Sequence, residues 1–131
     1  MRTALFILIP ALAAPLSAET QTLPVTADVG ICAHPQEVSL NTGGKSRVRV
    51  KGNEHYYLFN FDVQAIRNWR VTQASLHVKL AGGHLRRVAF CTVPAEWVEG
   101  TAMGKAQAGS TCFTHVKYPS AAWGPHGLNM M

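Results

Sequence analysis

Basic side chains recur at every second position of one short segment, and this spacing is the first sign of a chemistry in the chain. Arg47, Arg49 and Lys51 would share one face of a strand over 46–50, because successive side chains of a strand point to opposite faces. Such a strip could pair with carboxylates, and Tyr56 close by could stack on a sugar ring. An ordinary solvated surface is the alternative, since exposed charge pairs contribute little free energy.

Histidine, cysteine and carboxylate residues are spread along the chain, and their spacing selects no catalytic or metal site. Cys112 and His115 have a C-x-x-H spacing, but a copper site would need a second histidine and an axial methionine nearby. The other histidines fall on separate predicted elements, whereas zinc requires convergent ligands. The sequence has no G-x-S-x-G motif, and nothing selects a carboxylate pair for glycoside hydrolysis. We therefore expect no enzyme, no metal ion and no cofactor.

The start of the chain has the order of charged, apolar and small residues that is typical of a secretory signal peptide. Arg2 is followed by an apolar run over 4–14, and small residues lead to Ala18. The run is shorter than the roughly 20 residues that span a bilayer, although an uncleaved anchor or a buried helix is the alternative. We expect removal of residues 1–18, a mature domain over 19–131 with no membrane span, and a secreted, periplasmic or cell-surface protein.

A modest positive charge remains after this cleavage, because loss of Arg2 lowers the formal net charge from +5 to +4. Positive charge can favour acidic partners such as uronic-acid polysaccharides, anionic lipid or nucleic acid. A solvated surface is the alternative, because net charge mainly affects solubility and weak association. The basic residues are dispersed along the predicted strands and not run together, and we expect no nucleic acid as a partner.

Three cysteines remain in the mature chain, so they cannot all be paired with one another. An exported protein can keep disulfides. Cys91 and Cys112 each lie within a β-rich run, which favours their pairing over one with Cys32. Three buried thiols that act as small apolar groups are the alternative.

Short alternating or aromatic-rich segments separated by turn residues indicate an all-β protein. The predicted strands cover 25–29, 46–50, 55–61, 71–80, 85–93 and 111–117. Such a series is typical of an antiparallel β-sandwich or a barrel. No strand pattern is present over 121–131, so the sandwich would lack its last strands and leave an exposed edge.

Several of these segments resemble the DNRLRE-type domain, a secreted jelly-roll sandwich related to carbohydrate-binding modules. The matching positions are Asn41 and Gly43 before Arg47, then Phe61-Asp62, then Val71, Ala74, Leu76 and Val78, then Trp97 and Glu99-Gly100. The resemblance covers roughly 25–128. Trp123-Gly124 and Gly127 are similar to a stretch that normally continues into further strands. The resemblance implies extracellular polysaccharide recognition or adhesion, often within a larger protein, and some members are binders of acidic polysaccharide.

Two functions follow for this chain. The first is a non-catalytic extracellular module that binds acidic polysaccharide through Arg47, Arg49, Lys51 and Tyr56. The second is a structural or adhesive domain, or the N-terminal fragment of a larger surface protein with other domains, which would have no ligand of its own.

Overall fold

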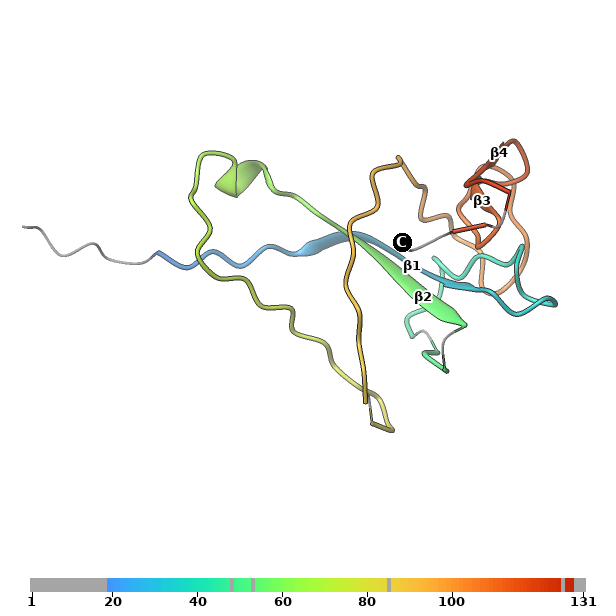
Figure 1. The fold of residues 1–131 in the computed structure, drawn as a ribbon, viewed down its shortest axis with the longest axis horizontal. Helices are drawn as coiled ribbons and strands as arrows, with labels where there is room; N and C mark the ends of the chain where they lie inside the picture. The colour runs from blue at the N-terminus through green and yellow to red at the C-terminus, as the bar shows by residue number, and fades with distance from the viewer. Residues whose placement is uncertain (1–18, 48, 53, 85, 126, 129–131) are drawn as a thin grey trace, which may run out of the picture.

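The structure is a computed structural model that describes residues 19–47, 49–52, 54–84, 86–125 and 127–128. The predicted signal peptide lies outside the described residues. The chain is β-rich, as predicted, and its strands form two small antiparallel sheets (Figure 1). The elements are β1 (Val25–Cys32), β2 (His55–Phe61), the 3-10 turn η1 (Gln64–Ile66), β3 (His115–Lys117) and β4 (Ala121–Ala122). Among the described residues, no helix has the length and apolar character needed to cross a bilayer.

The β1–β2 hairpin is the main element, and it confirms the strands predicted at 25–29 and 55–61. Both segments are rich in β-branched and aromatic residues, which suit a pleated, half-buried surface. The register pairs Val29 with Leu58 and Cys32 with His55. Because side chains alternate along each strand, Val29 and Leu58 lie on one face, and Cys32 and His55 lie on the other.

The apolar core lies on the first of these faces. Val29, Ile31, Leu58 and Leu128 are buried there. Partly buried side chains pack around them, namely Tyr56, Val93, Trp97, Phe113 and Trp123. Full burial of an aliphatic side chain of this size contributes roughly 1.5–3 kcal/mol. The C-terminal part of the chain is therefore held beside the hairpin, where Figure 1 shows it gathered near β3 and β4.

A buried polar residue, Asn41, joins the turn after β1 to the C-terminal part. Its side-chain amide donates to the carbonyl oxygens of Glu99 and Thr111, at 2.6 and 2.8 Å. Its side-chain oxygen accepts the Gly43 amide at 3.0 Å, and its backbone forms an antiparallel bridge with Lys105. Buried polar groups are costly unless they are hydrogen-bonded, so these bonds fix the position of the 41–45 turn.

The strands predicted over 71–80 and 85–93 are wrong for the described residues. Residues 71–80 and 86–93 belong to no strand, and residues 71–80 are all exposed. Leu76 and Phe90 keep 38% and 72% of their surface in water. The first segment leads away from the hairpin and the second returns to it, and the two approach each other only near the turn at 82–84 (Figure 1). The alternating pattern creates an apolar face, but burial of that face requires a second sheet opposite it. Since no such sheet is present in the described residues, the jelly-roll sandwich stays a prediction.

The strand predicted over 46–50 is also wrong for its described residues. Ser46 and Arg47 lie in a bend, Arg49 and Val50 have no regular structure, and residue 48 lies outside the description. The chain just before them forms a turn that is bonded to a distant segment, because the Gly44 amide donates to the carbonyl oxygen of Ala102 at 3.0 Å. This turn directs the basic residues to the edge of a pocket instead of along a flat strand.

The predicted Cys91–Cys112 disulfide is not formed. Cys112 is a completely buried free thiol whose Sγ lies 3.4 Å from Thr114 Oγ1. Cys91 is exposed and Cys32 is buried. The long strand predicted at 111–117 shortens to β3. The Thr111 amide donates to the Val98 carbonyl oxygen in an irregular segment, and the Cys112 amide closes a turn onto the His115 carbonyl oxygen, both at 2.9 Å.

Candidate functional site

An open pocket of about 440 Å³ lies where β1 ends and β2 begins. Its floor includes Cys32 and His55, which face each other across the two strands. Glu37 approaches from the turn after β1, and Lys45 from the turn that Asn41 holds. The pocket therefore collects side chains from the hairpin and from the loop that follows β1.

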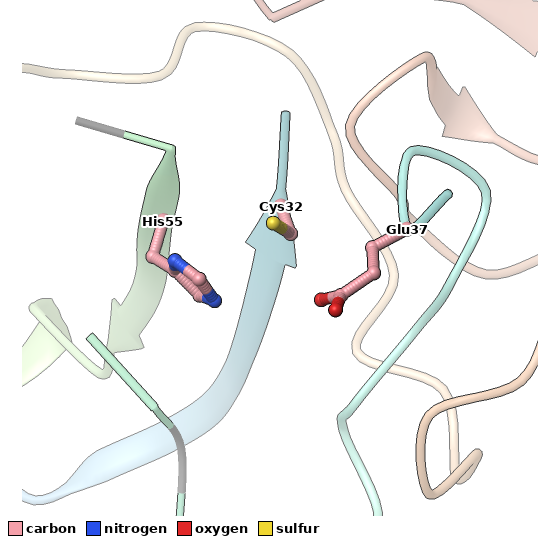
Figure 2. A group of neighbouring side chains, drawn as sticks. All are labelled: Cys32, Glu37 and His55. Atoms are coloured by element: carbon pink, nitrogen blue, oxygen red, sulfur yellow. The ribbon is translucent and has the colours of Figure 1, made fainter. Parts of the chain in front are cut away.

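Three potential metal ligands converge in this pocket. The Sγ of Cys32, a carboxylate oxygen of Glu37 and a ring nitrogen of His55 all lie within 4.8 Å of one another. Figure 2 shows the three side chains directed from β1, the following loop and β2 into one shared space. Cys32 is buried, whereas Glu37 and His55 are half-buried, so the cluster is reachable from the pocket.

The local backbone orients the members of this cluster. His55 Nδ1 lies 3.0 Å from the Lys51 carbonyl oxygen, a contact that places the proton on Nδ1. In that tautomer Nε2 keeps its lone pair for another partner. The turn that brings Glu37 back over Cys32 is closed by its amide, which donates to the His34 carbonyl oxygen at 2.7 Å.

Burial raises the pKa of the Cys32 thiol above its usual value, because the charged thiolate is poorly solvated there. The His34 backbone amide donates to Cys32 Sγ at 3.4 Å and opposes this shift. The negative charge of Glu37 raises the pKa further. In the absence of a metal ion, burial and the Glu37 charge therefore both favour the protonated thiol of Cys32 over the thiolate.

The rim of the pocket is basic. Lys45, Arg47 and Arg49 line it and are exposed, and none of them forms an ion pair with a carboxylate among the residues that the structure describes. Two of the four predicted ligand residues, Arg47 and Arg49, are thus brought together. Lys51 is exposed but does not line the pocket; its carbonyl oxygen contacts His55 instead.

Tyr56 lies away from the pocket, on the face of the hairpin that carries the core. Its ring stacks on Phe113 with centroids 5.7 Å apart, so the predicted stacking on a sugar would compete with the core. The aromatic side chains on the pocket face of β2 are Tyr57, Phe59 and Phe61, which all remain half-exposed. Their ring centroids lie 4.4 and 6.4 Å apart in succession, so they form an aromatic row that leads from His55 along the strand.

Comparison of the chain with protein-family models, with curated proteins and with solved structures finds no match. The resemblance to DNRLRE-type domains stays a prediction. The geometry of the pocket therefore carries the functional interpretation.

Sequence reasoning missed the cluster of Cys32, Glu37 and His55. A signal for the first pair is present only if the strand predicted at 46–50 is left out, because the end of one strand of an antiparallel hairpin then lies opposite the start of the next. Cys32 follows the first predicted strand and His55 opens the third. Glu37 gave no such signal, since only the geometry of the turn places it over Cys32.

Proposed function

We propose that this protein is a non-catalytic extracellular module that binds an acidic polysaccharide at the basic pocket. The observation that carries the proposal is the arrangement of Lys45, Arg47 and Arg49 around one pocket, with no carboxylate partner among the described residues. Unpaired cations around a concave surface raise the local concentration of anionic ligands.

The chemistry of the pocket suits a uronic-acid chain. A guanidinium group can bind a carboxylate through two parallel hydrogen bonds, which favours arginine where carboxylates are recognised. The aromatic row of Tyr57, Phe59 and Phe61 continues along the same face of the hairpin, and aromatic faces can pack against sugar rings. Each exposed charge pair contributes only about 0.2–1 kcal/mol, so affinity would come from several sugars bound together.

Retention on immobilised alginate or pectin tests this proposal. We expect retention at low salt that is lost as salt rises, because exposed charges are screened within about 10 Å at 0.1 M ionic strength. The double variant Arg47→Gln/Arg49→Gln should bind about 2- to 30-fold more weakly, from the loss of two such pairs. The matched control is Arg86→Gln/Arg87→Gln, which removes the same charge from an exposed segment outside the pocket. Equal retention of both variants, or no retention of the parent protein at low salt, would overturn the proposal.

A second candidate function is a structural or adhesive domain, or the N-terminal part of a larger surface protein without a ligand of its own. The observation that favours it is the exposed apolar surface of residues 71–80 and 86–93. Val78 and Phe90, for example, keep 55% and 72% of their surface in water. Large exposed apolar areas mark interaction surfaces, so another protein segment would cover these residues. This function predicts association through that surface and no dependence on Arg47 or Arg49.

A further inference from the structure

We propose that Cys32, Glu37 and His55 bind a divalent transition metal ion of the zinc class, with one coordination position open to the pocket. The inference goes beyond polysaccharide binding and does not depend on it. It rests on the convergence of three different donor atoms within 4.8 Å of one another.

The donor set selects the type of ion. Thiolate sulfur, imidazole nitrogen and carboxylate oxygen are the three ligand types that zinc accepts in proteins. Calcium and magnesium prefer oxygen ligands throughout, so a buried cysteine and a histidine disfavour both. Three protein ligands plus one open position is the arrangement of zinc sites that exchange a water or a ligand.

The distances fit after a small movement. Ligand atoms around a tetrahedral zinc ion lie about 3.5 Å apart, as follows from bond lengths of about 2.0–2.3 Å. No pair of the three donor atoms is more than 4.8 Å apart, so none needs to approach by more than roughly 1.3 Å. The backbones of Cys32 and His55 are fixed by their pairing in the sheet, but Glu37 is half-buried in a turn and can adjust through its side-chain torsions.

The surroundings of the ligands are those expected of a metal site. The contact between His55 Nδ1 and the Lys51 carbonyl oxygen leaves Nε2 as the metal-binding nitrogen, the usual outer contact of a histidine ligand. The His34 amide donates to Cys32 Sγ and would stabilise a thiolate there. As the bond from sulfur to metal forms, the thiol proton leaves to solvent, and the thiolate and the Glu37 carboxylate together balance the two positive charges of the ion.

The basic rim determines which kind of fourth ligand the metal ion would take. Lys45, Arg47 and Arg49 lie around the same pocket, so the fourth ligand would be a water molecule or an anion and not a cationic group. The same cations oppose metal entry.

Titration of the reduced, metal-free full chain with Co²⁺ alone tests the site, followed by displacement with Zn²⁺. Cysteine ligation of Co²⁺ should produce a charge-transfer absorption in the near ultraviolet, and zinc should abolish it. All proteins in the test carry Cys91→Ser, which removes an exposed cysteine outside the cluster. The substitution Cys32→Ser should abolish the absorption, and His55→Gln should weaken binding by roughly 100-fold.

Two further variants complete the design. His77→Gln removes an exposed histidine outside the cluster and should leave Co²⁺ binding unchanged. Glu37→Gln changes a half-buried side chain in a turn, so it tests the site even if Cys32→Ser fails to fold; binding should weaken by roughly 10-fold or more. An unchanged titration with Glu37→Gln and His55→Gln, or no charge-transfer absorption in the parent, would overturn the metal site while leaving polysaccharide retention untouched.

Discussion

The residues that pair across β1 and β2 fall into two groups, one on each face of the hairpin. Val29 and Leu58 pair on one face and are buried in the core. Cys32 and His55 pair on the other face and line the pocket. The same ladder that buries the apolar side chains therefore holds the two strand-borne metal ligands at a fixed spacing, and only Glu37 depends on a turn.

Tyr57 makes a side-chain contact on the pocket face that predicts a pH dependence of stability. Its hydroxyl donates to Asp28 Oδ2 at 2.5 Å. Burial raises the pKa of Tyr57, and the Asp28 carboxylate raises it further. Because the folded pKa exceeds the unfolded value, the stabilisation is fully present below the ordinary phenol pKa of about 10 and is lost as pH rises beyond it.

The substitution Tyr57→Phe should lower the free energy of unfolding by about 1 kcal/mol at neutral pH, the usual net value of one hydrogen bond. It should also remove part of the loss of stability above about pH 10. Urea unfolding of both proteins between neutral and alkaline pH measures the two effects. Parallel stability curves over the whole alkaline range would contradict this role of Tyr57. Phe59→Leu, which changes a neighbouring ring without a hydroxyl, is the control for aromatic packing.

At the scale of elements, the 41–45 turn depends on two close backbone approaches. A Cβ atom on Gly43 would lie 2.2 Å from the Glu99 carbonyl oxygen, and one on Gly44 would lie 2.2 Å from that of Thr101. Both neighbours are backbone atoms, so they cannot move aside as a flexible side chain could. These glycines allow the turn to contact residues 99–102 and to present Lys45 at the pocket.

The substitution Gly44→Ala should therefore destabilise the protein by roughly 1–3 kcal/mol, the usual cost of overpacking. It should also weaken polysaccharide retention, because the turn that carries Lys45 must move. Gly82→Ala is the matched control, since a Cβ atom there would meet nothing within 4 Å. Thermal unfolding compares the two variants, and equal midpoints would show that the turn does not depend on this contact.

The elements also show what the sequence could predict. The two strands of the hairpin were predictable, because both are rich in β-branched or aromatic residues. Their pairing was not, because a strand is predicted between them over 46–50. The strands expected over 71–80 and 85–93 had a clear alternation. Alternation defines which side chains share a face, but it does not supply the partner strand that buries them.

The pocket shows the same limit. Arg47 and Arg49 were predicted as ligand residues, and both lie at its rim, yet the strand that was to align them is absent from its described residues. Their position depends on the side-chain hydrogen bonds of Asn41. One reaches Glu99, 58 positions later in the chain, and the other reaches Thr111, 70 positions later. No local pattern predicts contacts over that distance, and this is why Tyr56 was expected near the basic residues and not against Phe113.

At the scale of the whole molecule, stability and interaction surface are divided between two parts of the chain. The core and the Asn41 bonds hold the hairpin to the C-terminal part. Residues 71–80 run away from that part and 86–93 return to it, as Figure 1 shows. Most of their apolar side chains are exposed, and Val93 alone among them packs against the core. Exposed apolar segments of this kind promote association between chains.

We therefore expect the isolated protein to associate as its concentration rises, through residues 71–80 and 86–93. The double variant Val78→Lys/Phe90→Lys should move association to a clearly higher concentration, because charges on an exposed edge oppose pairing. Light scattering over a dilution series measures the change. Val63→Lys adds a charge to a valine with 54% exposure outside these segments and should have a smaller effect. An equal effect of the control would mean that net charge alone governs association. A larger effect of the double variant, with polysaccharide retention intact, would show that the apolar interaction surface and the basic pocket are separate.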